Sequence, residues 1–408
     1  MSTSRKQKWL AVIAVPPFLI GVFVVGLFVF MNATARPLHP DPQKVPSVTQ
    51  ASPSPEWAAG VEQGRQVARA TIVAQNLPGM SVAVGAGGNI VWAEGFGWAD
   101  LDNQKAVAPD TRFRAGEASK TFTSAAVGLL LEQNKLKLDD EIQAYAPGFP
   151  KKQWPVTLRQ LMGHVGGLSD DPGDEASLSP CERTVDGLRL FAEHRLLFEP
   201  GTRYRPSSYS WILVSAAVEA AANERFFRFM RSNIFEPLGM AATRPDFAAE
   251  QIANRATFYH PRFAGDPRYG PESAREGDHS CYAGASAFLS TPSDLVRFGM
   301  AVSSGKLLQP GTVTLLQTPL RLRSGEETGY GLGWKVETLP LAGEPTRMAG
   351  HGTKADFIGG TTYLMTFPER GIVVAVMSNI AFADTRSIAL KIAEVFAGRG
   401  RNPGDPPI

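Results

Sequence analysis

The sequence predicts an α+β fold, in which an antiparallel β-sheet is flanked by helices from both chain ends and a mostly helical region is inserted. Near the N-terminus, residues 61–76 have apolar side chains at helical spacing, and two β-rich runs follow. Near the C-terminus, two apolar strands in residues 361–379 are followed by another helical pattern. This mirrored order indicates that both chain ends build one sheet.

Each element has a local signal. The first helix, "VEQGRQVARATIVAQN", stops before Pro78-Gly79. In "MSVAVGAGGNIVWAEGFGWADL", the Gly-rich turn between two β-rich runs is typical of a hairpin. "TTYLMTFPERGIVVAVMSN" turns at Pro-Glu-Arg-Gly, and "TRSIALKIAEVFAG" has the 3.6-residue period of a helix. Residues 111–307 between these ends read as mostly helical and loop-rich.

The N-terminus carries a long apolar run. Residues from Trp9 to Met31 have only apolar side chains, Gly and Pro, which is long enough for a helix to cross a bilayer core of ~30 Å. Basic residues precede this run, so we expect residues 1–34 to be a membrane anchor with the bulk of the chain outside the cytoplasm, periplasmic or extracellular. "NATA" at Asn32 to Ala35 leaves a cleaved signal peptide open, and a buried soluble helix is a third reading.

Composition bounds the rest of the chain. Residues 35–56 are rich in Pro and Ser and predict an extended linker, followed by one domain over 57–400 and a tail at 401–408. The 41 basic and 39 acidic residues form no basic block, which argues against nucleic-acid binding. No Cys/His metal spacing is present, and no cofactor is expected. Cys181 and Cys281 could pair in an oxidising compartment, or remain two buried thiols.

Several short phrases occur in a characteristic order. They are "LRQLMGHVGGL", "FEPGTRY", "FEPLGM", "AGASAFLSTPSDLVRFG", "YGLGWKV" and "AGHGTKADFIGG". With them, the chain from Glu56 to Gly398 resembles the serine β-lactamase and penicillin-binding-protein superfamily, closest to its class C β-lactamase and esterase-like branch. The resemblance implies a β-lactamase/transpeptidase-like fold and acyl transfer by three elements: a Ser with a Lys one turn later, a Tyr-x-Asn element and a Lys/His-Thr-Gly strand.

The first element has lost its nucleophile. In "FRAGEASKTF" the lysine position is Lys120, but the serine position is Glu117. Ser119 is the nearest hydroxyl. At ~100° per residue it points about 200° around the helix from position 117, whereas Lys120 lies only about 60° away. We therefore expect Ser119 to face away from the site.

The second element is also changed. "PGTRYRPSSYSWILV" places Pro206 on the family's Tyr and Ser208 on its Asn, and proline has no side-chain proton to offer. Tyr204 and Tyr209 lie close by, so a shift of register could bring one of them into the site. Otherwise both are packed loop aromatics.

The third element is partly kept. In "GHGTK" His351 matches the cation position, although a supporting or surface histidine is the alternative. Thr353 puts a β-branched side chain where the family's substrate lies beside the strand. His164, in "GHVGGL", matches a phrase whose role in the family is mainly loop structure.

The resemblance and the missing groups together predict a function. A carboxylate at Glu117 can pair with Lys120, activate a water molecule, or take part in ligand binding. We expect a membrane-anchored, outward-facing pseudoenzyme that binds a peptidoglycan-like polymer, a small acyl ligand or a protein. The positions that match the family's catalytic motifs are Glu117, Lys120, Ser208 and His351. The alternative is an active hydrolase of esters, amides or D-amino-acid peptides, using Glu117-activated water or another serine; a filament or scaffold protein would instead show a large exposed apolar patch.

Overall fold

The computed structural model describes residues 20–21, 23–169, 180–263, 265–353 and 359–398. Its main sheet has the strand order β1-β3-β2-β13-β12-β11-β10, with β4 paired to β3, and every pair in it is antiparallel. These strands are β1 (Ser47–Thr49), β2 (Gly79–Ala86), β3 (Asn89–Asp100), β4 (Lys105–Ala106), β10 (Lys335–Leu341), β11 (Glu344–Gly352), β12 (Thr361–Phe367) and β13 (Ile372–Ser378). The α+β prediction is confirmed, and so is the joining of the chain ends, because β2 pairs with β13 at the centre of the sheet.

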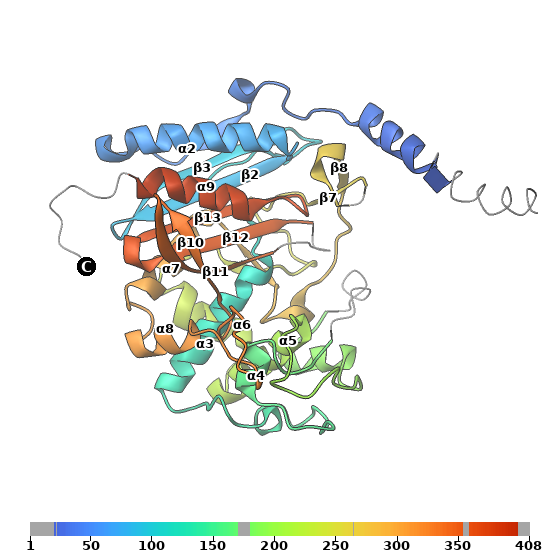
Figure 1. Ribbon diagram of the computed structural model, residues 1–408, viewed down its shortest axis with the longest axis vertical. Helices are drawn as coiled ribbons and strands as arrows, with labels where there is room; N and C mark the ends of the chain where they lie inside the picture. Colours follow the sequence, from blue (N-terminus) through green and yellow to red (C-terminus); the bar gives the residue numbers. More distant parts are fainter. Residues whose placement is uncertain (1–19, 22, 170–179, 264, 354–358, 399–408) are drawn as a thin grey trace, which may run out of the picture.

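Helices from both chain ends cover one face of this sheet. α2 (Pro55–Ala74) and α9 (Thr385–Ala397) lie side by side there (Figure 1), and Trp57 and Trp92 both stack on Phe396. α7 (Pro292–Ser303) packs on the opposite face. Both faces of the central strands are therefore buried, which is why these strands read as continuous apolar runs.

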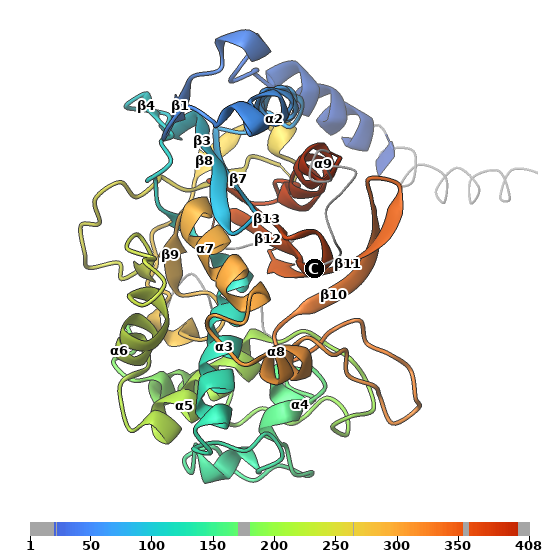
Figure 2. The ribbon, with the colours of Figure 1, turned by 90° about the vertical axis from the view of Figure 1, so that its left-hand side faces the viewer.

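The inserted region is helical and lies beyond the α7 face (Figure 2). Its helices are α3 (Ser119–Glu132), α4 (Leu158–Met162), α5 (Ser208–Ala222), α6 (Phe226–Met230) and α8 (Pro310–Leu316). Two small sheets contain β5 (Phe113–Arg114), β6 (Arg244–Pro245) and β9 (Phe288–Ser290), and β7 (Tyr259–Pro261) with β8 (Pro271–Ser273). Short 3₁₀ or π turns are η1 (Pro42–Lys44), η2 (Gly116–Ala118), η3 (Ile142–Ala144), η4 (Thr184–Leu190), η5 (Arg231–Phe235), η6 (Pro267–Tyr269), η7 (Ser280–Tyr282) and η8 (Pro368–Arg370).

The segment before α2 contains a short strand. Residues 47–49 form β1, which pairs with β3, so this part of residues 35–56 belongs to the sheet. Residues 20–21 and 23–34 are helical, and Phe23 and Phe28 are 71% and 59% exposed. Within the described residues, no helix combines the length and apolar character needed to cross a bilayer. The first part of the predicted apolar run, up to residue 19, lies outside the described residues.

The two cysteines are joined. Cys181 and Cys281 form a disulfide that links η7 to the chain just before η4, and both residues are buried. Of the two alternatives left open by the sequence, the structure has the paired one.

Candidate functional site

The entrance to α3 places a carboxylate and an ammonium group in contact. Gly116 has a φ of +52°, which turns the chain into η2, and this turn packs against β11 and β12. Lys120 follows Glu117 by one helical turn, and its Nζ lies 2.5 Å from Glu117 Oε1. The Lys120 side chain is 1% exposed and that of Glu117 33% exposed. The lysine that would assist a serine is therefore hydrogen-bonded to the residue that replaces the serine.

The surroundings keep this carboxyl group ionised. Burial raises the pKa of Glu117, but the charge of Lys120, the electrostatic effect of His351 and the hydrogen bond from Lys120 outweigh burial and hold the pKa below its ordinary value. A carboxylate with a lowered pKa is a weak base at neutral pH. The arrangement is thus better suited to an ion pair than to taking a proton from water.

Thr353 also contacts position 117. The backbone N–H of Glu117 donates a hydrogen bond of 3.1 Å to Thr353 Oγ1. Thr353 is 4% exposed, and its own N–H donates to the carbonyl of Thr362, which continues the pairing of β11 with β12. The hydroxyl of Thr353 is therefore fixed against the first residue of the motif.

His351 lies within electrostatic range of Glu117 and Lys120, on the last residues of β11, and is paired with a tyrosine. Its Nε2 is 2.7 Å from the hydroxyl of Tyr330. Burial, followed by the charge of Lys120, lowers the pKa of His351 to about 4. At neutral pH this residue is uncharged, so it does not supply the cation that its motif position implies.

Tyrosines from two loops complete the cluster. Tyr204 lies 5.8 Å from Tyr330, ring centre to ring centre, and is 37% exposed. Burial, followed by the charge of Glu117, raises the pKa of Tyr204 to about 12, while burial raises the pKa of Tyr330 well above its ordinary value. Tyr204 therefore faces the site. The sequence left this possibility open, because a shift of register in the second motif could bring Tyr204 there. Tyr330 lies in the "YGLGW" phrase, which by itself predicts no role in the site for this tyrosine.

His164 forms the back of this cluster. Its ring lies 4.9 Å from that of Tyr330, and its Nδ1 accepts a hydrogen bond from the backbone N–H of Ser207, the N-cap of α5. Burial, followed by the charge of Lys120, lowers its pKa well below the ordinary value. A neutral imidazole that holds the start of α5 fits the structural role expected for this residue.

The hydroxyl groups near the motifs lie in three different environments. Ser119 has no exposed surface, and among the described residues its Oγ has no hydrogen-bond partner. Ser208 is half-buried at the start of α5. Tyr209 is buried and stacks on Phe191, with ring centres 4.6 Å apart. The structure thus brings Glu117, Lys120 and His351 together and buries Ser119 in the packing around α3.

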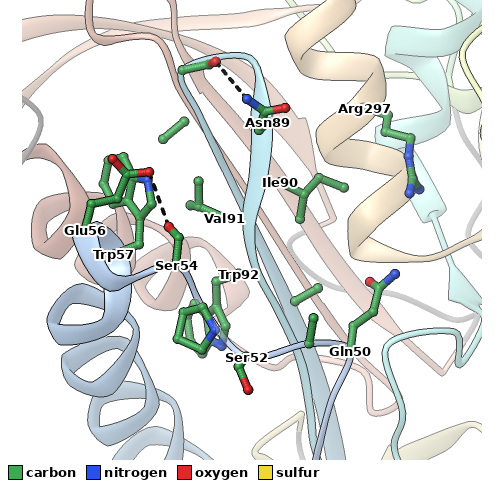
Figure 3. A pocket seen from close by; sticks show the side chains of 15 residues that line it. Gln50, Ser52, Ser54, Glu56, Trp57, Asn89, Ile90, Val91, Trp92 and Arg297 are labelled. Carbon is green, nitrogen blue, oxygen red and sulfur yellow. Dashed lines mark hydrogen bonds between the residues drawn. The ribbon is translucent and has the colours of Figure 1, made fainter.

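A separate pocket of about 600 Å³ lies at the tip of the β2–β3 hairpin, where residues 50–57 cross it (Figure 3). Its lining includes Trp57, Ile90 and Arg297. None of the cluster residues described above lines it. Among the described residues, no group of three or more His, Cys, Asp or Glu side chains is arranged to hold a metal ion.

Comparisons with known proteins identify the family of this chain. The family model described as "Beta-lactamase" matches residues 61–397. The chain is 26% identical to the mitochondrial serine β-lactamase-like protein LACTB of Bos taurus, over 83% of this chain and 80% of that protein. It is 27% identical to penicillin-binding protein 4* of Bacillus subtilis, over 66% of this chain and 62% of that protein.

Solved structures show the same fold. The octameric penicillin-binding protein homologue from Pyrococcus abyssi superposes with a TM-score of 0.71 at 21% identity, covering 83% of this chain and 77% of that one. FmtA from Staphylococcus aureus superposes with a TM-score of 0.70 at 17% identity, covering 88% and 92%. With its family model spanning most of the sequence, this chain belongs to the β-lactamase family of serine hydrolases and penicillin-binding proteins.

Proposed function

We propose that this chain is a pseudoenzyme of the β-lactamase family, which forms no serine acyl-enzyme and uses the site around Glu117 and Tyr204 to bind a ligand or partner. The observation that carries the proposal is the ion pair between Lys120 and Glu117. An acyl-transfer site needs a hydroxyl nucleophile beside a group that takes its proton. Here a carboxylate occupies the first position and binds the second group directly.

The ligand class follows from the family and the accessible groups. The exposed part of Glu117 and the phenol of Tyr204 offer hydrogen bonds and an aromatic surface. A peptidoglycan-like polymer or a small acyl compound presents the amides and hydroxyls that such groups bind. Similarity to penicillin-binding protein 4* supports this choice.

The N-terminal segment supports attachment to a membrane, with the domain on the outer side. The helical residues before 35 expose large apolar side chains, and in Figure 1 this helix projects from the body of the domain. Membrane fractions from cells making the full chain should retain it after a high-salt wash. A variant lacking residues 1–34 should be released, and equal retention of both would contradict the proposed anchor.

A hydrolase that uses water activated by Glu117 is the second candidate. The one-third exposure of the Glu117 side chain favours it, because water can reach the carboxylate. The lowered pKa of Glu117 and the engagement of Lys120 weigh against it.

Intact-protein mass spectrometry tests the main proposal. The full-length chain is incubated at neutral pH with a fluorophosphonate and separately with a penicillin, beside a serine β-lactamase as a positive control. We expect a mass increase on the control alone. An adduct on this chain, mapped to Ser119 or Ser208, would make it an active serine hydrolase. Steady turnover of ester or D-amino-acid peptide substrates that is lost in Glu117→Gln would instead support the water-activating candidate.

A further inference from the structure

We propose that Thr353 is a second, independent block to acyl transfer. Its hydroxyl accepts the hydrogen bond of the backbone N–H of residue 117, and this N–H would otherwise bind the oxyanion that forms during acyl transfer. The inference rests on the proposed function and extends it. Restoring a serine at position 117 would return the nucleophile but leave this N–H engaged. The loss of acylation is therefore attributed to two residues that lie 236 positions apart in the chain.

The geometry of the N–H group supports this role. Acyl transfer develops negative charge on an oxygen close to the nucleophile, and backbone N–H groups about 2.7–3.1 Å away stabilise it. The N–H of Glu117 lies at the entrance to α3, where the N-terminal end of a helix favours a negative ligand. In this chain its acceptor is Thr353 Oγ1, at 3.1 Å.

The acceptor is held in place. Thr353 is almost fully buried, its backbone N–H is bonded to the carbonyl of Thr362, and a β-branched side chain has few χ1 states. Swinging the hydroxyl away would leave a buried polar group without a partner. An incoming oxyanion therefore has to compete with a neighbour that is already fixed at hydrogen-bonding distance.

Two features of Thr353 can act separately, and substitution distinguishes them. The hydroxyl occupies the N–H, whereas the methyl group and Cβ take up space beside the strand. Thr353→Val keeps the branched shape and removes the acceptor. Thr353→Ser keeps the acceptor, and Thr353→Gly removes both features.

The test starts from Glu117→Ser and adds each Thr353 substitution to it, using the full-length chain. The introduced hydroxyl attacks the phosphorus of a fluorophosphonate, the new O–P bond replaces P–F, fluoride leaves, and the buffer takes up the hydroxyl proton. The rate of adduct formation is measured by intact mass over a range of probe concentrations, giving the maximal rate and the half-saturating concentration. Thermal unfolding of each variant shows that it is folded.

We expect Glu117→Ser alone, and with Thr353→Ser, to be labelled slowly or not at all. With Thr353→Gly the maximal rate should rise about 100-fold, because one oxyanion donor contributes a factor of about 10²–10³, and the half-saturating concentration should fall. Thr353→Val should leave labelling slow, since its methyl group takes the place of the hydroxyl beside the N–H of residue 117. A block by the methyl group of Thr353 alone would instead make Thr353→Ser as fast as Thr353→Gly.

The possible outcomes distinguish a failure of the inference about Thr353 from a failure of the pseudoenzyme proposal. If folded Glu117→Ser is labelled as fast as Glu117→Ser/Thr353→Gly, the inference about Thr353 is wrong, while the pseudoenzyme proposal stands. If Glu117→Ser/Thr353→Gly is folded and still unlabelled, the inference is also wrong, because blocks other than these two then control the site. Labelling of the unchanged protein would overturn the pseudoenzyme proposal instead.

Discussion

Replacing Glu117 by glutamine should destabilise the protein, because it leaves the buried ammonium of Lys120 without a counter-charge. Removing one partner of a fully buried ion pair costs about 3–5 kcal/mol. Because one third of the Glu117 side chain is exposed, we reduce this to about 2–3 kcal/mol. With an unfolding entropy of about 2.1 cal/mol/K per residue, a domain of roughly 340 residues should lose about 3–4 °C in Tm.

The assay is differential scanning calorimetry at pH 7 on the parent, Glu117→Gln and Glu117→Gln/Lys120→Met. The double variant removes both charges, so it should recover most of the lost stability. Ser119→Ala is a matched control on the same helix and should leave Tm within about 1 °C, because the hydroxyl it removes has no partner among the described residues. A Tm of Glu117→Gln equal to that of the parent would refute the reasoning.

The stability lost in Glu117→Gln should depend on pH. The folded-state pKa of Glu117 lies below its ordinary value of 4.5. Its contribution to stability is therefore complete above about pH 4.5 and is lost as the pH falls through the folded-state pKa. The difference in Tm between the parent and Glu117→Gln should shrink as the pH is lowered from 5 towards 3. A difference that grows on acidification would contradict the assigned direction of the shift.

Three further predictions concern other parts of the molecule. The disulfide closes a separation of 100 residues, so Cys181→Ser/Cys281→Ser should lower the free energy of unfolding by up to about 4.7 kcal/mol, measured by denaturant titration; no change would mean that the bond does not constrain the unfolded chain. Asp246→Asn removes the carboxylate 2.7 Å from buried Arg114 and should cost about 3–5 kcal/mol in the same assay, whereas a loss below 1 kcal/mol would show that the pair is not buried in solution. Since the pKa of Tyr204 is raised to about 12, Tyr204→Phe should leave the tyrosinate absorbance gained up to pH 11 nearly unchanged, and a loss of one tyrosine's signal near pH 10 would place Tyr204 in open solvent.

Much of the sheet could be predicted because its signals are local. The β2–β3 hairpin turns through Gly87 and Gly88, both at positive φ, and the β12–β13 connection ends at Gly371 with a φ of +61°. Apolar runs on either side of such turns fix the strands without knowledge of the rest of the chain. β10 gave no comparable signal, since it is an edge strand in which only Leu341 is fully buried, and it contains Pro340.

The candidate site also contains both local contacts, which the sequence predicts, and long-range contacts, which it does not. The contact between Glu117 and Lys120 follows from their spacing of three residues on one helical turn. Tyr204, Tyr330 and Thr353 reach the site from loops and a strand end that are distant in sequence. Their positions depend on how α3, α5 and β11 pack, and no pattern within a short window of sequence records that packing.

The pairing of β2 with β13 also governs when this protein can finish folding. Met80 lies opposite Ser378, so the centre of the sheet joins segments that are far apart in the chain. Until β13 leaves the ribosome, β2 has no partner on one side, and contacts across so long a chain form slowly. An open, apolar strand edge can pair with other chains, so β2 is exposed to aggregation until β13 binds it. A chain truncated before residue 372 would leave that edge open permanently.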